Sequence, residues 1–146
     1  MIMFDSILVV CMGNICRSPI GENLMKRAFP KKDISSAGLS ALVGEPADNL
    51  AIEVSKKNNL LLDPHIARQI TAVMCRQSDL ILVMERKHID MITHIAPEVR
   101  GKTMLFGHWL HMEEIADPYR RSRESFELVY RLLDESTHAW VKALSR

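Results

Sequence analysis

Short apolar runs alternate along this chain with longer segments in which apolar residues recur every three or four positions. The apolar runs lie at residues 4–10, 80–84 and 102–106, and a weaker one covers residues 33–37. Short continuous runs of this kind are typical of strands that are buried on both faces of a parallel sheet. We therefore predict four strands at these positions.

The segments between the apolar runs predict helices. Helical spacing covers residues 19–29, 47–58 and 85–95, a brief helical turn follows Thr71, and the longest segment runs from about residue 123 to residue 144. Ser18 is a suitable N-cap for the first of these helices. Pro19 suits the first helical position, where its missing N–H costs nothing.

The alternation of strands and helices indicates an α/β fold with right-handed connections, and residues 1–146 form one domain. We expect a four-stranded parallel sheet with helices on both faces. In such sheets ligands bind beyond the carboxyl ends of the strands, where the strand order reverses. The loop that follows the first strand is therefore the expected site.

Composition narrows the functional class. A formal charge of +1 gives no signal for nucleic acid, and we find no apolar run long enough for membrane insertion and no signal peptide. Three cysteines, Cys11, Cys16 and Cys75, are too few for a secreted disulfide scaffold, which favours a cytoplasmic location. Neither the cysteines nor the scattered histidines have the spacing of zinc ligands, so we predict no metal and no cofactor.

The loop after the first strand has the chemistry of an anion site. Cys11 and Arg17 bracket it, Gly13 and Asn14 lie between them, and Ser18 follows. Backbone N–H groups in a tight loop and at a helix N-terminus bind anions. Gly13 and Asn14 tolerate backbone conformations that most residues disfavour, and the Arg17 fork matches two phosphate oxygens. The loop therefore predicts a phosphate site.

The same surroundings predict a nucleophile at Cys11. A helix N-terminus and a neighbouring cation both stabilise a thiolate, and the Ser18 hydroxyl is a further donor to the sulfur. The alternative is that Cys11 is one more buried strand residue and Arg17 a surface charge. A bare Cys-x5-Arg spacing would favour that alternative, but the apolar strand before the loop and the Ser-Pro pair after it favour the phosphate loop.

The segment VCMGNICRSP at residues 10–19 resembles the signature loop of the low-molecular-weight protein tyrosine phosphatases. The resemblance extends through Ser-Ala-Gly at 36–38, His-Ile-Ala-Arg-Gln-Ile at 65–70 and Ala-Asp-Pro-Tyr at 116–119. It is strongest to the bacterial branch associated with exopolysaccharide and capsule operons. It implies a four-stranded α/β domain that hydrolyses phosphotyrosine in two steps without a metal or cofactor.

The resemblance also implies roles for individual residues. Cys11 would be the nucleophile that becomes phosphocysteine, and Asp117 the general acid that then activates water. Phosphate would be held by Arg17 and by the loop amides, which belong to Met12, Gly13, Asn14, Ile15, Cys16 and Arg17.

Further residues would support the loop and the substrate. Asn14 and Ser18 would shape the loop, and His65 would brace Asn14 from behind. Met12 and Tyr119 would flank the substrate ring. The natural partner would be a phosphotyrosine protein, such as a membrane tyrosine kinase with a tyrosine-rich tail.

Each of two features near these residues has two interpretations. Cys16 is either a small buried side chain or a redox partner that forms a reversible disulfide with Cys11. Arg120, Arg121 and Arg123 are either a solvated surface or a basic rim that steers acidic phosphotyrosine segments. Some relatives carry a second tyrosine where this chain has Arg120, which makes regulation through paired tyrosines doubtful here.

Two other functions compete with the phosphatase. An arsenate reductase can share this fold and loop, but it needs a relay of further cysteines, and only Cys75 is available in the C-terminal half. A phosphate-binding module without catalysis would need neither the nucleophile Cys11 nor the acid Asp117.

Overall fold

The computed structural model describes residues 4–62 and 64–145, in which a four-stranded sheet has the order β2-β1-β3-β4. β1 is Ser6–Cys11, β2 is Asp33–Gly38, β3 is Leu80–Val83 and β4 is Thr103–Leu105. Every pair of neighbouring strands is parallel. This confirms the predicted α/β fold with its parallel sheet.

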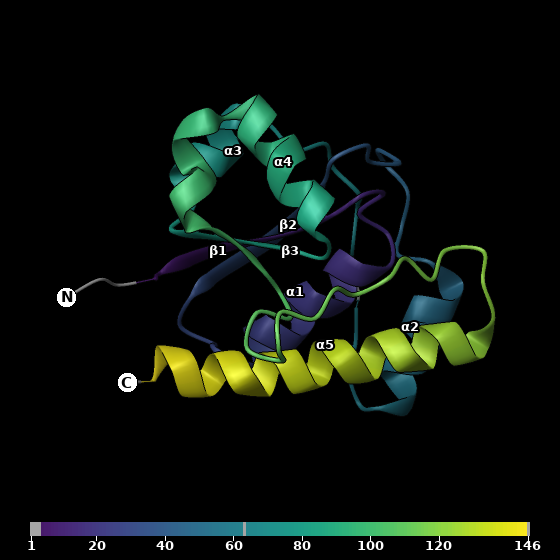
Figure 1. The fold of residues 1–146 in the computed structure, drawn as a ribbon. Coiled ribbons are helices and arrows are strands. Elements are labelled where there is room, and N and C mark those ends of the chain that lie inside the picture. Colours follow the sequence, from purple (N-terminus) through teal and green to yellow (C-terminus); the bar gives the residue numbers. More distant parts are fainter. Residues whose placement is uncertain (1–3, 63, 146) are drawn as a thin grey trace.

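Helices cover both faces of this sheet (Figure 1). α3 and α4 lie on one face, while α1, α2 and α5 lie on the other. The bounds are α1 Arg17–Ala28, α2 Asn49–Lys57, α3 Ala72–Gln77, α4 Arg86–Ile95 and α5 Arg123–Leu144, with a short 3₁₀ helix η1 at Pro97–Lys102. Within the described residues, no helix has the length and apolar character that crossing a membrane requires.

The alternation of side chains along β1 divides the core in two. Ile7, Val9 and Cys11 are buried in the cluster beneath α1 and α5, whereas Leu8 and Val10 are buried in the cluster beneath α3 and α4. Successive strand residues point to opposite faces, and both faces here are covered. This explains why the strand reads as a continuous apolar run instead of an alternating one.

The central position of β1 determines where a ligand can bind. β2 lies on one side of β1 and β3 on the other, so the strand order reverses at β1. The loop after β1 therefore lies at the switch point of the sheet, as predicted. Cys11 differs slightly from expectation, because it is the last residue of β1 and not the first of the loop.

The start of α1 corrects the predicted N-cap. Cys16 occupies the cap position, Arg17 is the first helical residue and Pro19 the third. The Ser18 hydroxyl does not cap the helix because it lies 3.0 Å from the Cys11 sulfur. Among the described residues, no side chain caps this end. The first N–H groups of α1 therefore remain available to an anion.

Gly38 is the last residue of β2, and the backbone of the phosphate loop, residues 11–17, approaches it closely. A Cβ at this position would lie 2.5 Å from the Met12 carbonyl oxygen. That oxygen also accepts a hydrogen bond from the Ser40 N–H at 3.0 Å. The loop can approach β2 this closely only because residue 38 has no side chain.

We predict that Gly38→Ala destabilises the fold by about 1–3 kcal/mol, the usual effect of overpacking, and weakens phosphate binding by displacing the loop. Gly101→Ala is the matched control, because a Cβ there meets nothing within 4 Å. Thermal unfolding and phosphate titration measure both effects. Equal behaviour of the two variants would show that the contact at Gly38 does not constrain the loop.

Candidate active site

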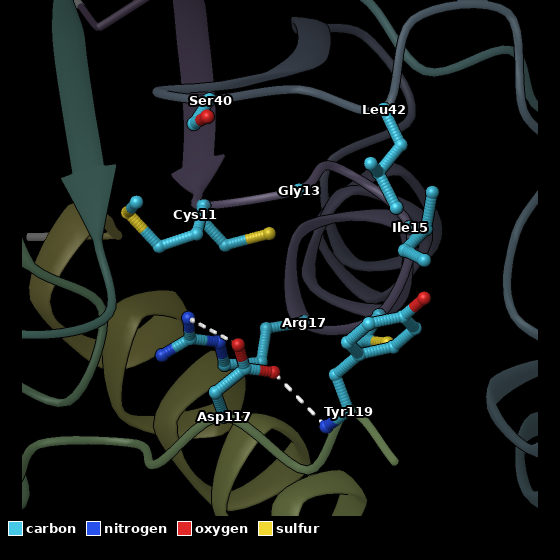
Figure 2. Close-up of a pocket in the computed structure, with 10 residues that line it drawn as sticks. Cys11, Gly13, Ile15, Arg17, Ser40, Leu42, Asp117 and Tyr119 are labelled. Carbon is cyan, nitrogen blue, oxygen red and sulfur yellow. Dashed lines mark hydrogen bonds and ion pairs between the residues drawn. The ribbon is translucent and has the colours of Figure 1, made fainter.

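A cavity of about 220 Å³ opens at the carboxyl end of β1 (Figure 2). It combines the phosphate loop with two distant segments, one after β2 and one before α5. The lining residues are Cys11, Met12, Gly13, Ile15, Cys16, Arg17, Ser40, Leu42, Asp117 and Tyr119. Of these, Ser40 and Leu42 were not predicted. Nothing local marks them, because they belong to an irregular segment that reaches the cavity only through the turn after β2.

Arg17 is buried, with 1% of its surface exposed, and two partners bind one end of its guanidinium. Its Nη1 donates to Glu85 Oε2 at 2.7 Å and to the Ile115 carbonyl at 2.8 Å. Nε has no hydrogen-bond partner among the described residues, and Nη2 has only an ion pair with Asp117, at 3.6 Å. The Nε–Nη2 edge is therefore the free side of the fork, the side that binds two oxygens of an oxyanion.

Glu85 is a site residue that the sequence reasoning missed. It directly precedes α4, and its carboxylate anchors the guanidinium of Arg17. Partial burial on its own raises the pKa of Glu85, but the hydrogen bond and charge of Arg17 outweigh it and lower the pKa overall. The carboxylate is thus ionised at neutral pH. Only its position after a buried strand, at the same sheet edge as the phosphate loop, could have marked it.

Asp117 reaches the cavity from the loop before α5. Its Oδ1 accepts a hydrogen bond from the Tyr119 N–H at 3.0 Å, and its Oδ2 lies 3.6 Å from Arg17 Nη2. Figure 2 shows the carboxylate between Arg17 and the backbone of Tyr119. The side chain is 44% exposed, so it meets both the cavity and solvent. The Asp-Pro-Tyr turn thus places a carboxyl group on the cavity beside Arg17.

The side-chain amide of Asn14 donates hydrogen bonds to two hydroxyl groups. Asn14 Nδ2 donates to Ser18 Oγ at 2.7 Å and to Ser36 Oγ at 3.0 Å. Each hydroxyl therefore accepts from the amide and is free to donate its own proton elsewhere. The neighbour of Ser18 Oγ is Cys11 Sγ, and Ser36 Oγ donates to Glu22 Oε1 at 2.5 Å. Ser18 Oγ therefore has its own proton available for the Cys11 sulfur, which lies within hydrogen-bond distance.

Asn14 is also the point at which the loop is tied to the fold. Its φ is 59°, in the left-handed region that the sequence predicted for it. Its Oδ1 accepts from the Arg68 N–H at 2.9 Å, and its carbonyl accepts from His65 Nε2 at 2.6 Å. Asn14, Ser18 and His65 are absent from the cavity lining, and Ser18 and His65 contact the loop through Asn14.

Gly13 differs from its predicted conformational role. Among the described glycines only Gly44 has a positive φ, and a Cβ at Gly13 would make ordinary contacts with Ile15 and Leu42 at 3.7–3.9 Å. Asn14 takes the left-handed position instead. Gly13 lines the cavity, where the lack of a side chain leaves room for a ligand.

The two cysteines of the loop are both free and buried but have different surroundings. Burial raises the pKa of the Cys16 thiol, and the negative charge of Asp48 raises it further. Cys11 Sγ instead has the Ser18 hydroxyl as a hydrogen-bond partner at 3.0 Å. The arrangement favours Cys11 as the nucleophile, with Cys16 as a neutral thiol on the same cavity.

The predicted basic rim divides into separate parts. The Arg120 guanidinium carbon lies 5.3 Å from the centre of the Tyr119 ring, a cation–π contact at the cavity mouth. Arg123 pairs with Glu53 at 3.0 Å and with Glu127 at 3.5 Å. Arg120 therefore lies over the Tyr119 ring, while the charge of Arg123 is offset by carboxylates.

The assembled groups can perform a displacement at phosphorus. A sulfur, a free guanidinium edge and a carboxyl group face one small cavity, and the uncapped end of α1 adds N–H donors. Within residues 4–62 and 64–145, no three His, Cys, Asp or Glu side chains gather as a metal site would.

Comparison with known proteins agrees with this geometry. The family described as "Low molecular weight phosphotyrosine protein phosphatase" matches residues 6–146. The probable low molecular weight protein-tyrosine-phosphatase AmsI of Erwinia amylovora is 59% identical over 99% of this chain and 100% of its own length.

Two solved structures extend the comparison. The tyrosine phosphatase Wzb of Escherichia coli K30, in complex with sulphate, is 56% identical over 97% of this chain and 99% of its own, with a TM-score of 0.95. Wzb of Vibrio vulnificus, in complex with benzylphosphonate, is 51% identical over 97% and 100%, also with a TM-score of 0.95. The chain therefore belongs to the low molecular weight phosphotyrosine protein phosphatase family and is a protein-tyrosine phosphatase.

Proposed function

We propose that this enzyme hydrolyses phosphotyrosine in two steps through a phosphocysteine at Cys11. In the first step the thiolate attacks phosphorus, the bond to the tyrosine oxygen breaks, and Asp117 gives that oxygen a proton. In the second step Asp117 takes a proton from water, the water oxygen attacks phosphorus, and the P–S bond breaks. The products are tyrosine, inorganic phosphate and the original thiolate.

The observation that carries this proposal is the convergence of Cys11, Arg17 and Asp117 on one cavity. The Nε–Nη2 edge of Arg17 and the loop amides would bind the three equatorial oxygens, whose charge persists in the transition state. Sulphate and benzylphosphonate, the ligands of the two Wzb structures, have the tetrahedral oxyanion that this arrangement would bind. The benzyl ring corresponds to the tyrosine ring, for which Tyr119 and Leu42 would form the walls.

We also propose a setting for this activity. From the resemblance to the exopolysaccharide and capsule branch, the physiological substrate is a membrane tyrosine kinase with a tyrosine-rich tail. A nucleophile that must stay a free thiolate suits a reducing compartment, so the enzyme acts in the cytoplasm. An arsenate reductase is less favoured, because Cys75 lies in the core cluster on the other face of the sheet from Cys11 and cannot relay a disulfide.

Replacement of Cys11 tests the nucleophile. We expect Cys11→Ser to lower turnover of a phosphotyrosine peptide by at least about 10⁴-fold, the scale seen when a hydrolase loses its nucleophile, while phosphate still binds. Rapid quenching of the wild-type reaction should trap a phosphoryl group on Cys11, mapped by mass spectrometry. Cys75→Ala is the control and should form the same intermediate. A phosphoryl group on any other residue would refute the mechanism.

Replacement of Asp117 tests the general acid. Asp117→Asn should slow aryl phosphates with poor leaving groups by about 10²–10⁴-fold, the usual contribution of a positioned acid, and those with good leaving groups much less. Kinetics across a series of phenols with different acidity measure this slope. Asp90→Asn, an exposed surface change, should leave the slope unchanged. Equal slowing of all substrates would remove Asp117 from this role.

The position of Arg120 at the cavity mouth predicts a preference for acidic peptides. Arg120→Ala should lower kcat/KM for a phosphotyrosine peptide with acidic neighbours by about two- to fivefold, as expected for an exposed ion pair. The loss should shrink at high salt, which screens exposed charges. Arg123→Ala is matched in charge but should have no such effect, because Glu53 and Glu127 offset Arg123. Equal losses in both variants would indicate general steering instead of a contact by Arg120.

A further inference from the structure

His88 is a buried histidine near the phosphate site that the proposed mechanism does not use. It is the third residue of α4, and its side chain is fully shielded from solvent. Its Nε2 is buried and has no hydrogen-bond partner among the described residues. Buried polar atoms in native proteins are usually paired, so this unpaired nitrogen calls for an explanation.

The hydrogen bonds of His88 fix the position of its proton. The Glu85 N–H donates to Nδ1 at 3.2 Å. Since a backbone N–H can only donate, Nδ1 carries a lone pair, and the neutral ring has its proton on Nε2. That nitrogen lies 3.6 Å from Glu85 Oε2, the same oxygen that accepts from Arg17 Nη1 at 2.7 Å. An N–H dipole is therefore close to the carboxylate that anchors Arg17.

The charge state of His88 suits this arrangement. Burial lowers the pKa of His88 to about 4, and the charges of Arg17 and Lys87 act in the same direction against those of Glu85 and Asp117. The ring is thus neutral near pH 7. A neutral ring stabilises the carboxylate through a dipole, whereas a charged ring would compete with Arg17 for it.

We propose that His88 is a positioning residue for Arg17, acting through Glu85. The Nε2–H dipole holds the Glu85 carboxylate in the orientation that anchors Nη1, and this leaves the Nε–Nη2 edge of Arg17 turned toward the phosphoryl group. The distance of 3.6 Å makes the contact electrostatic instead of a direct hydrogen bond. The inference rests on the proposed role of Arg17 in phosphate binding.

Two substitutions separate this role from a purely structural one. The side-chain oxygen of His88→Asn can replace Nδ1 as the acceptor for the Glu85 N–H, but its amide does not extend to the position of Nε2. The amide of His88→Gln extends to that position but does not replace Nδ1. His88→Asn therefore keeps the acceptor for the Glu85 N–H at the start of α4, whereas His88→Gln keeps the N–H that faces the Glu85 carboxylate.

We expect His88→Asn mainly to lower activity and His88→Gln mainly to lower stability. His88→Asn should lose about tenfold in kcat/KM for a phosphotyrosine peptide and in vanadate affinity, because a misplaced guanidinium binds the transition state poorly. His88→Gln should stay within about threefold of the wild type in both, but should show the larger drop in melting temperature. Vanadate, which mimics the transition state, should be weakened more than inorganic phosphate.

The decisive measurements are inhibition constants for vanadate and phosphate, determined below the melting temperature of every variant. Unchanged vanadate affinity in folded His88→Asn would overturn the proposal, as would losses in both variants that simply parallel their stabilities. In a Glu85→Gln background, His88→Asn should cause no further loss, and additive losses would also refute action through Glu85. Failure of the phosphocysteine mechanism is recognised separately, because the wild type would then form no phosphoryl-Cys11.

Discussion

The burial of the Arg17 guanidinium is the constraint on which this site depends. A buried cation is costly unless it is paired and hydrogen-bonded. Here the carboxylate of Glu85 and the carbonyl of Ile115 meet only the Nη1 end. The start of α1, the start of α4 and the segment before α5 are thereby fixed to one group. The same partners leave Nε without a hydrogen bond and Nη2 with only the ion pair to Asp117, so the fold holds a cation with donors left for an oxyanion.

A second constraint is the hydrogen-bond network around the Asn14 side chain. Because the Asn14 amide donates to both Ser18 and Ser36, neither hydroxyl uses its own proton in that contact. The proton of Ser18 is thus available for Cys11, and Ser36 donates to Glu22. The network joins the loop, β2 and α1, so the surroundings of the proposed nucleophile Cys11 depend on residues that do not line the cavity. This is pre-organisation, in which the donors are in place before charge develops.

Neighbouring residues of the same type differ in chemical character here because their surroundings differ. Two buried cysteines border the same cavity, but burial and Asp48 raise the pKa of Cys16, whereas Cys11 has the Ser18 hydroxyl as a hydrogen-bond partner. A reversible disulfide between the two cysteines stays one of the two interpretations of Cys16. Arginines divide in the same way, since Arg120 lies on the Tyr119 ring while acidic neighbours offset the charge of Arg123.

The sequence by itself determined the α/β fold and the anion loop, because buried strands and a strand–loop–helix junction are local patterns. Asp117 was found only through the family resemblance, since an Asp-Pro turn alone is common. The N-cap prediction for Ser18 was wrong because its hydroxyl contacts Cys11 instead of the helix end. Only the tertiary structure brought in Glu85 and His88, whose roles depend on a buried charge supplied from another strand–helix junction. The sequence around a buried cation does not indicate which distant residue will pair with it.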